Sequence, residues 1–201
     1  MKARWAAVVV ALAAFACAFS EAATFRVVPD QTRVGFAVPP PGIGLEQGHF
    51  DLTWGKIVLD PERHAGSIDF VVDAGSINTG WDLRDAFLKS EWMFDVQRYP
   101  SIRFHSTRLA FEGARLVGVD GDITLHGVTR PIRFDVTHIE CGADSVNGRD
   151  GCVALVTGRI SRSAFGMSFA IPLVGDEIAL DFAITAIRVL DDREAETPRA
   201  Q

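Results

Sequence analysis

The feature that most constrains this chain is a repeated alternation of apolar and polar residues in segments of strand length. Ile132, Phe134 and Val136 alternate with Arg133 and Asp135, and other segments repeat this period of two. Because successive side chains of a β-strand point to opposite faces, the pattern predicts strands with one buried face. We expect about eight strands, at residues 24–38, 47–60, 66–75, 101–112, 114–125, 128–140, 152–162 and 177–190.

The links between these segments predict how the strands pair. Links such as PERHA, EGA and HG are too short for a crossover, so neighbouring strands should be antiparallel and form a meander. A meander of long amphipathic strands leaves two open edges unless it closes on itself. We therefore expect an all-β fold, an eight-stranded antiparallel up-and-down barrel. A two-sheet sandwich is the alternative, and strands of ten or more residues favour the barrel.

Residues 76–95, SINTGWDLRDAFLKSEWMFD, interrupt the strand pattern with a helical one. Leu83, Phe87 and Met93 lie near one helical face, so we expect an amphipathic helical insert between the third and fourth strands. Such an insert could seal the open end of the barrel with Trp81, Phe87, Trp92, Met93 and Phe94. The sequence leaves open whether these side chains seal the mouth or belong to the ordinary core.

The first 22 residues are typical of a secretory signal. Lys2 and Arg4 precede an apolar run, and Ser20 and Ala22 suit the small-residue positions before a cleavage site. The run is short for a retained membrane anchor, and AFAC at 14–17 fits a lipoprotein cleavage site badly. We expect a signal peptide at 1–22, a barrel domain at 23–190 and a disordered polar tail at 191–201.

Export changes what the cysteines can do. Cys17 leaves with the signal, and Cys141 and Cys152 remain. In an oxidising compartment such a pair predicts a disulfide, closing the mouth of a hairpin and stabilising the fold by about 2–3 kcal/mol. A metal pair or a redox site is the alternative, but neither further ligands at zinc-like spacing nor a C-x-x-C motif accompanies the two cysteines.

Charge and motifs exclude several classes of function. Removing Lys2, Arg4 and Glu21 with the signal changes the formal net charge from −6 to −7, which disfavours nucleic acid as a partner. No HExxH, GxSxG, P-loop or GxGxxG motif is present. His105 and His126 could meet at a metal across neighbouring strands, although solvent-facing histidines are the simpler interpretation. We expect no enzyme activity, no metal and no cofactor.

Four stretches in order, 76–107, 117–136, 160–167 and 174–186, resemble the YceI-like, polyisoprenoid-binding family. They include SINTGWDLRDAFLKSEWMFDVQRYPSIRFHST, VGVDGDITLHGVTRPIRFDV, ISRSAFGM and VGDEIALDFAITA. The resemblance implies an exported, periplasmic, lipocalin-like barrel, extended and eight-stranded. It also implies that an apolar tunnel holds a long isoprenoid, a prenyl quinone or a similar amphipathic lipid, with a tail of about 40 carbons as the expected case.

Alternation along the strands predicts the wall of such a tunnel. The expected wall residues are Phe36, Val38, Ile68, Phe70, Phe104, Val119, Ile123, Phe134, Phe182 and Ile184. Trp81 and Phe87 of the insert are expected to join them. Arg84 and Arg162 could face a phosphate or quinone head, or could instead form ion pairs that join the insert to the barrel.

Fourteen phenylalanines, most at alternating strand positions, should point inward together. If they line a cavity, the protein carries a lipid; if they fill the barrel, it is a packed, non-catalytic module. Such a module would act as a homodimer or as a partner of a membrane redox protein. A hydrolase is the third reading, and Ser161 and Ser163 lack an evident base to support it. We expect the carrier.

Overall fold

The structure is a computed structural model, and it describes residues 22–38, 46–146 and 148–190. Strands dominate this part of the chain, with one α-helix, α1 (Asp82–Lys89), and three short 3-10 helices at Pro29–Gln31, Ala74–Ser76 and Arg162–Phe165. The strands are β1 (Ala23–Val27), β2 (Arg33–Val38), β3 (Glu46–Phe50), β4 (Thr53–Asp60), β5 (Ala65–Asp73), β6 (Ile77–Asn78), β7 (Ser101–Glu112), β8 (Arg115–Leu125), β9 (Val128–Val146), β10 (Arg149–Ser161) and β11 (Glu177–Val189).

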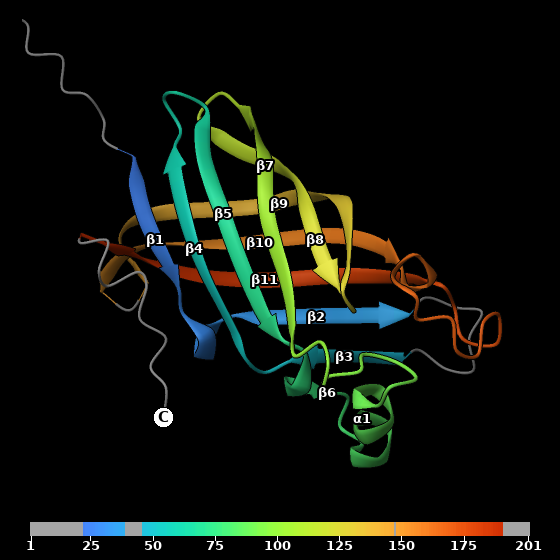
Figure 1. Cartoon of the computed structure of the whole chain (residues 1–201). Coiled ribbons are helices and arrows are strands. Elements are labelled where there is room, and N and C mark those ends of the chain that lie inside the picture. The colour runs from blue at the N-terminus through green and yellow to red at the C-terminus, as the bar shows by residue number, and fades with distance from the viewer. Residues whose placement is uncertain (1–21, 39–45, 147, 191–201) are drawn as a thin grey trace, which may run out of the picture.

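The strands close into an antiparallel barrel (Figure 1). Its order is β1-β4-β5-β7-β8-β9-β10-β11, and β11 returns to β1 with Val27 opposite Ala186. The first half of β11 pairs instead with β2, which pairs with β3. Thus β1 with β2, and β3 with β4, act as two interrupted long strands. Segments adjacent in sequence pair all round the ring, which confirms the eight-stranded meander and excludes the sandwich.

The interruptions and irregularities have local causes. Pro29 has no backbone N–H to donate to a ladder, and the first long strand breaks there into a 3-10 turn. Thr107 is an extra residue in β7, because Ser106 lies opposite Gly121 and Arg108 opposite Asp120. Such β-bulges bend a strand and increase its twist, which helps long strands to wrap around a closed barrel.

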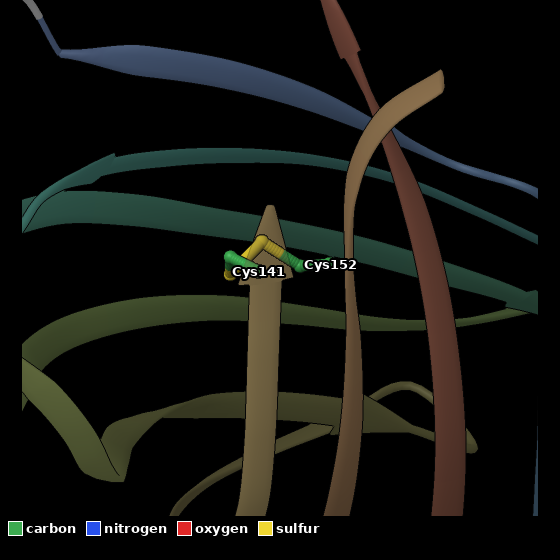
Figure 2. Close-up of a disulfide and its surroundings, with 2 residues drawn as sticks. All are labelled: Cys141 and Cys152. Carbon is green, nitrogen blue, oxygen red and sulfur yellow. A yellow bond between two sulfur atoms is a disulfide. The ribbon is translucent and has the colours of Figure 1, made fainter. Parts of the chain in front are cut away.

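The β9–β10 hairpin is longer than the sequence predicts. Its strands pair as far as Val146 and Arg149, and Cys141 lies opposite Cys152 within the ladder. The two residues form the expected disulfide, with Cα atoms 4.1 Å apart (Figure 2). The bond therefore joins two paired strands and does not close the mouth of a loop, because residues predicted to be a turn continue the ladder.

The two ends of the barrel differ. At one, which we call the hairpin end, lie the short links after β4, β7 and β9 and both ends of the described chain. At the other, the mouth end, lie α1, within the link 74–100, and the link 162–176 before β11 (Figure 1). The mouth end also has one two-residue turn, His126–Gly127. Both of its residues have positive φ, 51° and 73°, as a type I′ turn requires.

The expected signal peptide lies outside the described residues except for Ala22, and the expected tail, 191–201, lies outside them entirely. No helix in the described part of the chain is both long enough and apolar enough to cross a membrane.

Candidate functional site: the barrel cavity and its mouth

The inward-facing side chains enclose a cavity of about 570 Å³. This volume lies within the range of small-molecule sites, roughly 300–1,000 Å³. The wall is built from strands on all sides of the barrel, and its polar members are Gln47, Thr79, Arg84, Arg103 and Arg162. None of the described residues in the wall is an aspartate or glutamate. The barrel therefore encloses apolar space and is not packed solid.

Thirteen of the fourteen residues predicted to contact a ligand lie in this wall. They are Phe36, Val38, Ile68, Phe70, Arg84, Phe87, Phe104, Val119, Ile123, Phe134, Arg162, Phe182 and Ile184. The remaining residue, Trp81, is not part of the wall, and 58 % of its surface is exposed. Its ring lies 5.8 Å from the guanidinium carbon of Arg84. Contact of these residues with a ligand stays a prediction.

A row of aromatic rings crosses the wall. The ring of Phe134 lies 5.2 Å from that of Phe104 and 5.3 Å from that of Phe182, between centroids. Gly158 makes room for this row, because a Cβ atom there would lie 2.6 Å from the Phe134 ring. Pairing a small residue with a large one is a common way to fit side chains inside a small barrel. Here it lets the Phe134 ring occupy the wall beside β10.

Several wall residues escaped sequence analysis because they lie in links without a period of two. The insert contributes Leu88, which was not expected, besides the expected Phe87, Met93 and Phe94. The link 162–176 contributes Met167, Phe169, Ala170, Leu173 and Val174. The available signal was composition, since residues 166–175, GMSFAIPLVG, contain no charge in a segment that pattern alone marks as a surface loop.

The insert seals the mouth only in part. Phe87, Met93 and Phe94 line the cavity as expected, whereas Trp92 is 63 % exposed. Leu83 lies one helical turn before Phe87 and is also exposed. The helix α1 ends at Lys89, so Met93 does not continue its face. Of the two possibilities left open by the sequence, neither holds for Trp81 and Trp92, because both are exposed and lie outside the wall.

Arg162 fastens the link 162–176 to the barrel. Its buried guanidinium donates hydrogen bonds to the carbonyl oxygens of Met167 (2.8 Å), Val174 (3.0 Å) and Gly175 (2.9 Å). Burial lowers the pKa of Arg162, while the nearby Asp176 carboxylate opposes that effect; an arginine nevertheless stays charged. These three bonds direct the charge toward the link.

Two further contacts hold the same link. The backbone N–H and the hydroxyl of Ser163 each donate to the Asp176 carboxylate at 2.8 Å. These bonds, the backbone one foremost, lower the pKa of Asp176. The Nδ1 atom of His126 lies 3.0 Å from the carbonyl oxygen of Phe165. The link is thus bound at both of its ends and to the neighbouring β8–β9 turn.

A polar group lies at the mouth, beside the helix. Arg84 donates from Nε to the Thr79 hydroxyl (2.8 Å) and from Nη2 to the Thr79 carbonyl (2.9 Å). The Thr79 backbone N–H donates in turn to Asp85 (2.9 Å), and its hydroxyl contacts the same carboxylate. Because Arg84, Thr79 and Gln47 are all part of the wall, this group can meet the polar end of a bound molecule.

Among the described residues, the histidines and the serine singled out in the sequence have separate partners. His105 Nδ1 lies 2.6 Å from Asp69 on the exposed outer face, while His126 faces the Phe165 carbonyl, so the two histidines do not share a metal. Ser163 is bonded to Asp176. Within the described ranges, no group of three or more His, Cys, Asp or Glu side chains could hold a metal ion.

Comparison with known proteins places this architecture. Residues 25–186 match the sequence profile of the YceI-like domain. The chain belongs to the YceI-like family. A UPF0312 protein of Vibrio campbellii is 29 % identical to it over 153 residues, which is 75 % of this chain and 78 % of the relative. A UPF0312 protein of Photorhabdus laumondii is 29 % identical over 171 residues, 83 % of this chain and 88 % of the relative.

Solved structures share the fold of this YceI-like protein. Burkholderia cenocepacia BcnA superposes with a TM-score of 0.67 at 22 % identity, covering 79 % of this chain and 98 % of BcnA. A polyisoprenoid binding domain from Saccharophagus degradans superposes with a TM-score of 0.60 at 18 % identity, covering 84 % of this chain and the whole of that domain. At these identities the likeness concerns the fold.

Proposed function

We propose that this protein is an exported, periplasmic carrier that holds a long, amphipathic lipid, such as a polyisoprenoid or a prenyl quinone, inside its barrel. The observation that carries the proposal is the enclosed cavity of about 570 Å³ with its almost wholly apolar wall. Removing an apolar tail from water into such a space is favourable roughly in proportion to the area buried. The polyisoprenoid-binding domain of the same fold lends it support.

The volume limits the length of the enclosed tail. The cavity of about 570 Å³ has room for many water-sized groups. The part of a tail that exceeds this room would extend through the mouth. Affinity should accordingly rise with chain length until the interior is filled and then level off.

The charges of the wall favour one kind of head group. Arg84 and Thr79 are hydrogen-bonded to each other and, like Gln47, are part of the wall, and the part of the wall that the structure describes contains no carboxylate. An anionic or hydrogen-bond-accepting head, such as a phosphate or a quinone carbonyl, would suit these donors. The alternative is a packed module that pairs with a second copy or with a membrane redox protein. The size of the cavity weighs against packing, and we propose a non-catalytic role in either case.

Occupancy of the barrel tests the carrier. Protein purified without detergent should release a lipid on organic extraction, detectable by mass spectrometry. Ala154→Phe puts a ring on β10 into the cavity and should weaken binding of a prenyl ligand roughly tenfold or more. Leu155→Phe is the matched control, because the neighbouring side chain points outward and is 46 % exposed; it should change binding less than about twofold. An empty extract, or equal effects of the two variants, would overturn the proposal.

A further inference from the structure

Apolar side chains on the surface gather at the mouth end. Seven of the eleven large apolar side chains that are exposed in the described chain belong to two segments, 81–92 and 169–173. We call these seven residues the mouth rim: Trp81, Leu83, Phe87, Trp92, Phe169, Ile171 and Leu173. The two segments meet where the rings of Phe87 and Phe169 lie 5.1 Å apart.

The rim is continuous with the cavity. Phe87, Phe169 and Leu173 are exposed and also line the cavity, so they mark its opening. The other four residues of the rim are exposed without lining it. A molecule that leaves the cavity at this point passes from an apolar interior directly onto an apolar surface.

The link 162–176 is suited to a surrounding without water. Residues 166–175 carry no charge. Within the link, Gly166 donates to Ser163, Ile171 to Ser168 and Val174 to Ala170 through backbone hydrogen bonds. The buried Arg162 occupies three further carbonyl oxygens, as described above. Backbone groups that enter a lipid phase must be satisfied internally, and this loop meets much of that requirement with its own bonds.

We propose that the mouth rim inserts into the outer acyl boundary of a lipid bilayer, so that a lipid passes between bilayer and cavity without crossing water. This inference rests on the proposed carrier function. A bilayer suits the rim better than a second copy of the chain does, because a second copy would cover the opening. Tryptophans beside aliphatic side chains are typical of membrane interfaces. Opposite charges alternate along 82–91, so insertion is driven by apolar burial and not by attraction to anionic lipids.

Flotation with vesicles of neutral phosphatidylcholine tests the rim. The mature protein should float with the vesicles and should do so equally at high salt, because charge attraction is not the cause. Leu83→Glu combined with Ile171→Glu should reduce the bound fraction roughly tenfold, since a carboxylate at this depth opposes insertion. Leu155→Glu is the matched control, an exposed leucine on the outer wall of β10, and should bind vesicles like the unchanged protein.

Neither substituted rim residue lines the cavity, so a prenyl probe in vesicle-free solution should bind the double variant within about twofold of the unchanged affinity. Its transfer from vesicles to the protein should slow in proportion to vesicle binding. Absence of flotation, flotation that requires anionic lipid, or equal flotation of all variants would overturn the inference. A dimer in ultracentrifugation that the double variant dissociates, without vesicle binding, would assign the rim to a second copy instead. Flotation without binding of the prenyl probe would refute the proposed carrier function and leave membrane insertion of the rim in place.

Discussion

The links at the two ends of the barrel differ in length and in polarity. At the hairpin end the links are short and polar, and polar side chains there find hydrogen-bond partners close by in sequence. Asp60, for example, accepts two hydrogen bonds from Arg63, and these bonds lower the pKa of Asp60. At the mouth end, two long links carry apolar side chains on the surface and into the cavity. The difference shows that one end serves mainly to close the strands, while the other can serve to admit a ligand.

The largest expected effect would come from breaking the support of the mouth end. Arg162→Ala leaves three carbonyl groups without their donor, and we expect the free energy of unfolding to fall by about 3 kcal/mol or more. Urea denaturation would measure the loss. Arg159→Ala is the matched control, since Arg159 is exposed and pairs with Glu177 at 2.7 Å on the surface; its loss should cost less than about 1 kcal/mol. Equal losses would mean that the link does not depend on Arg162.

At the hairpin end the corresponding support is the disulfide. Reduction of Cys141–Cys152 should lower the free energy of unfolding by about 2–3 kcal/mol. The reason is that the unfolded chain regains the conformational entropy of the loop that the bond closes, between residues eleven positions apart. Denaturation of oxidised and reduced protein would measure this difference. A loss close to zero would show that the long β9–β10 ladder already holds these strands without the bond.

A smaller effect should distinguish the cavity from the outer wall. Gly158→Ala places a methyl group 2.6 Å from the Phe134 ring, which must move into the cavity; we expect a stability loss of about 1–2 kcal/mol and weaker prenyl binding. Gly118→Ala is its control, because the atoms nearest to the added methyl group belong to the flexible end of the Arg133 side chain. Fluorescence titration should find reduced affinity in the first variant and unchanged affinity in the second.

The smallest expected effect is a dependence on acid. The pKa of Asp176 is lowered in the folded protein, so its stabilising contribution is complete above its ordinary pKa of 3.8 and is lost as the pH falls through the lower folded value. Release of a bound probe should therefore quicken below about pH 4. Asp176→Asn should remove that pH step, whereas Asp120→Asn should keep it. The pKa of Asp120 is also lowered, chiefly by Arg108, but Asp120 lies on the outer wall. If Asp176→Asn kept the pH step unchanged, titration of Asp176 would not be its cause.

The period of two in the sequence predicts most of the fold. It located the strands within a few residues, apart from the hairpin at Cys141 and Cys152, and it identified the inward row that includes Phe104, Phe134 and Phe182. Those positions were accessible because alternation is a local property of strand geometry. The apolar wall residues of the link 162–176 were not, since a loop has no fixed period and its side chains take their direction from tertiary contacts.

The sequence by itself determined the strands, their antiparallel order and the faces that turn inward, because each depends on the residues of one segment or on the length of one link. Only the tertiary structure decided that the barrel is hollow, that Trp81 and Trp92 stay outside its wall, and that Arg162 binds three carbonyl groups of the link 162–176. These properties depend on how the volumes and hydrogen-bonding groups of distant segments combine. They cannot be read from any single stretch of the chain, because packing and hydrogen bonding join residues that are far apart in sequence.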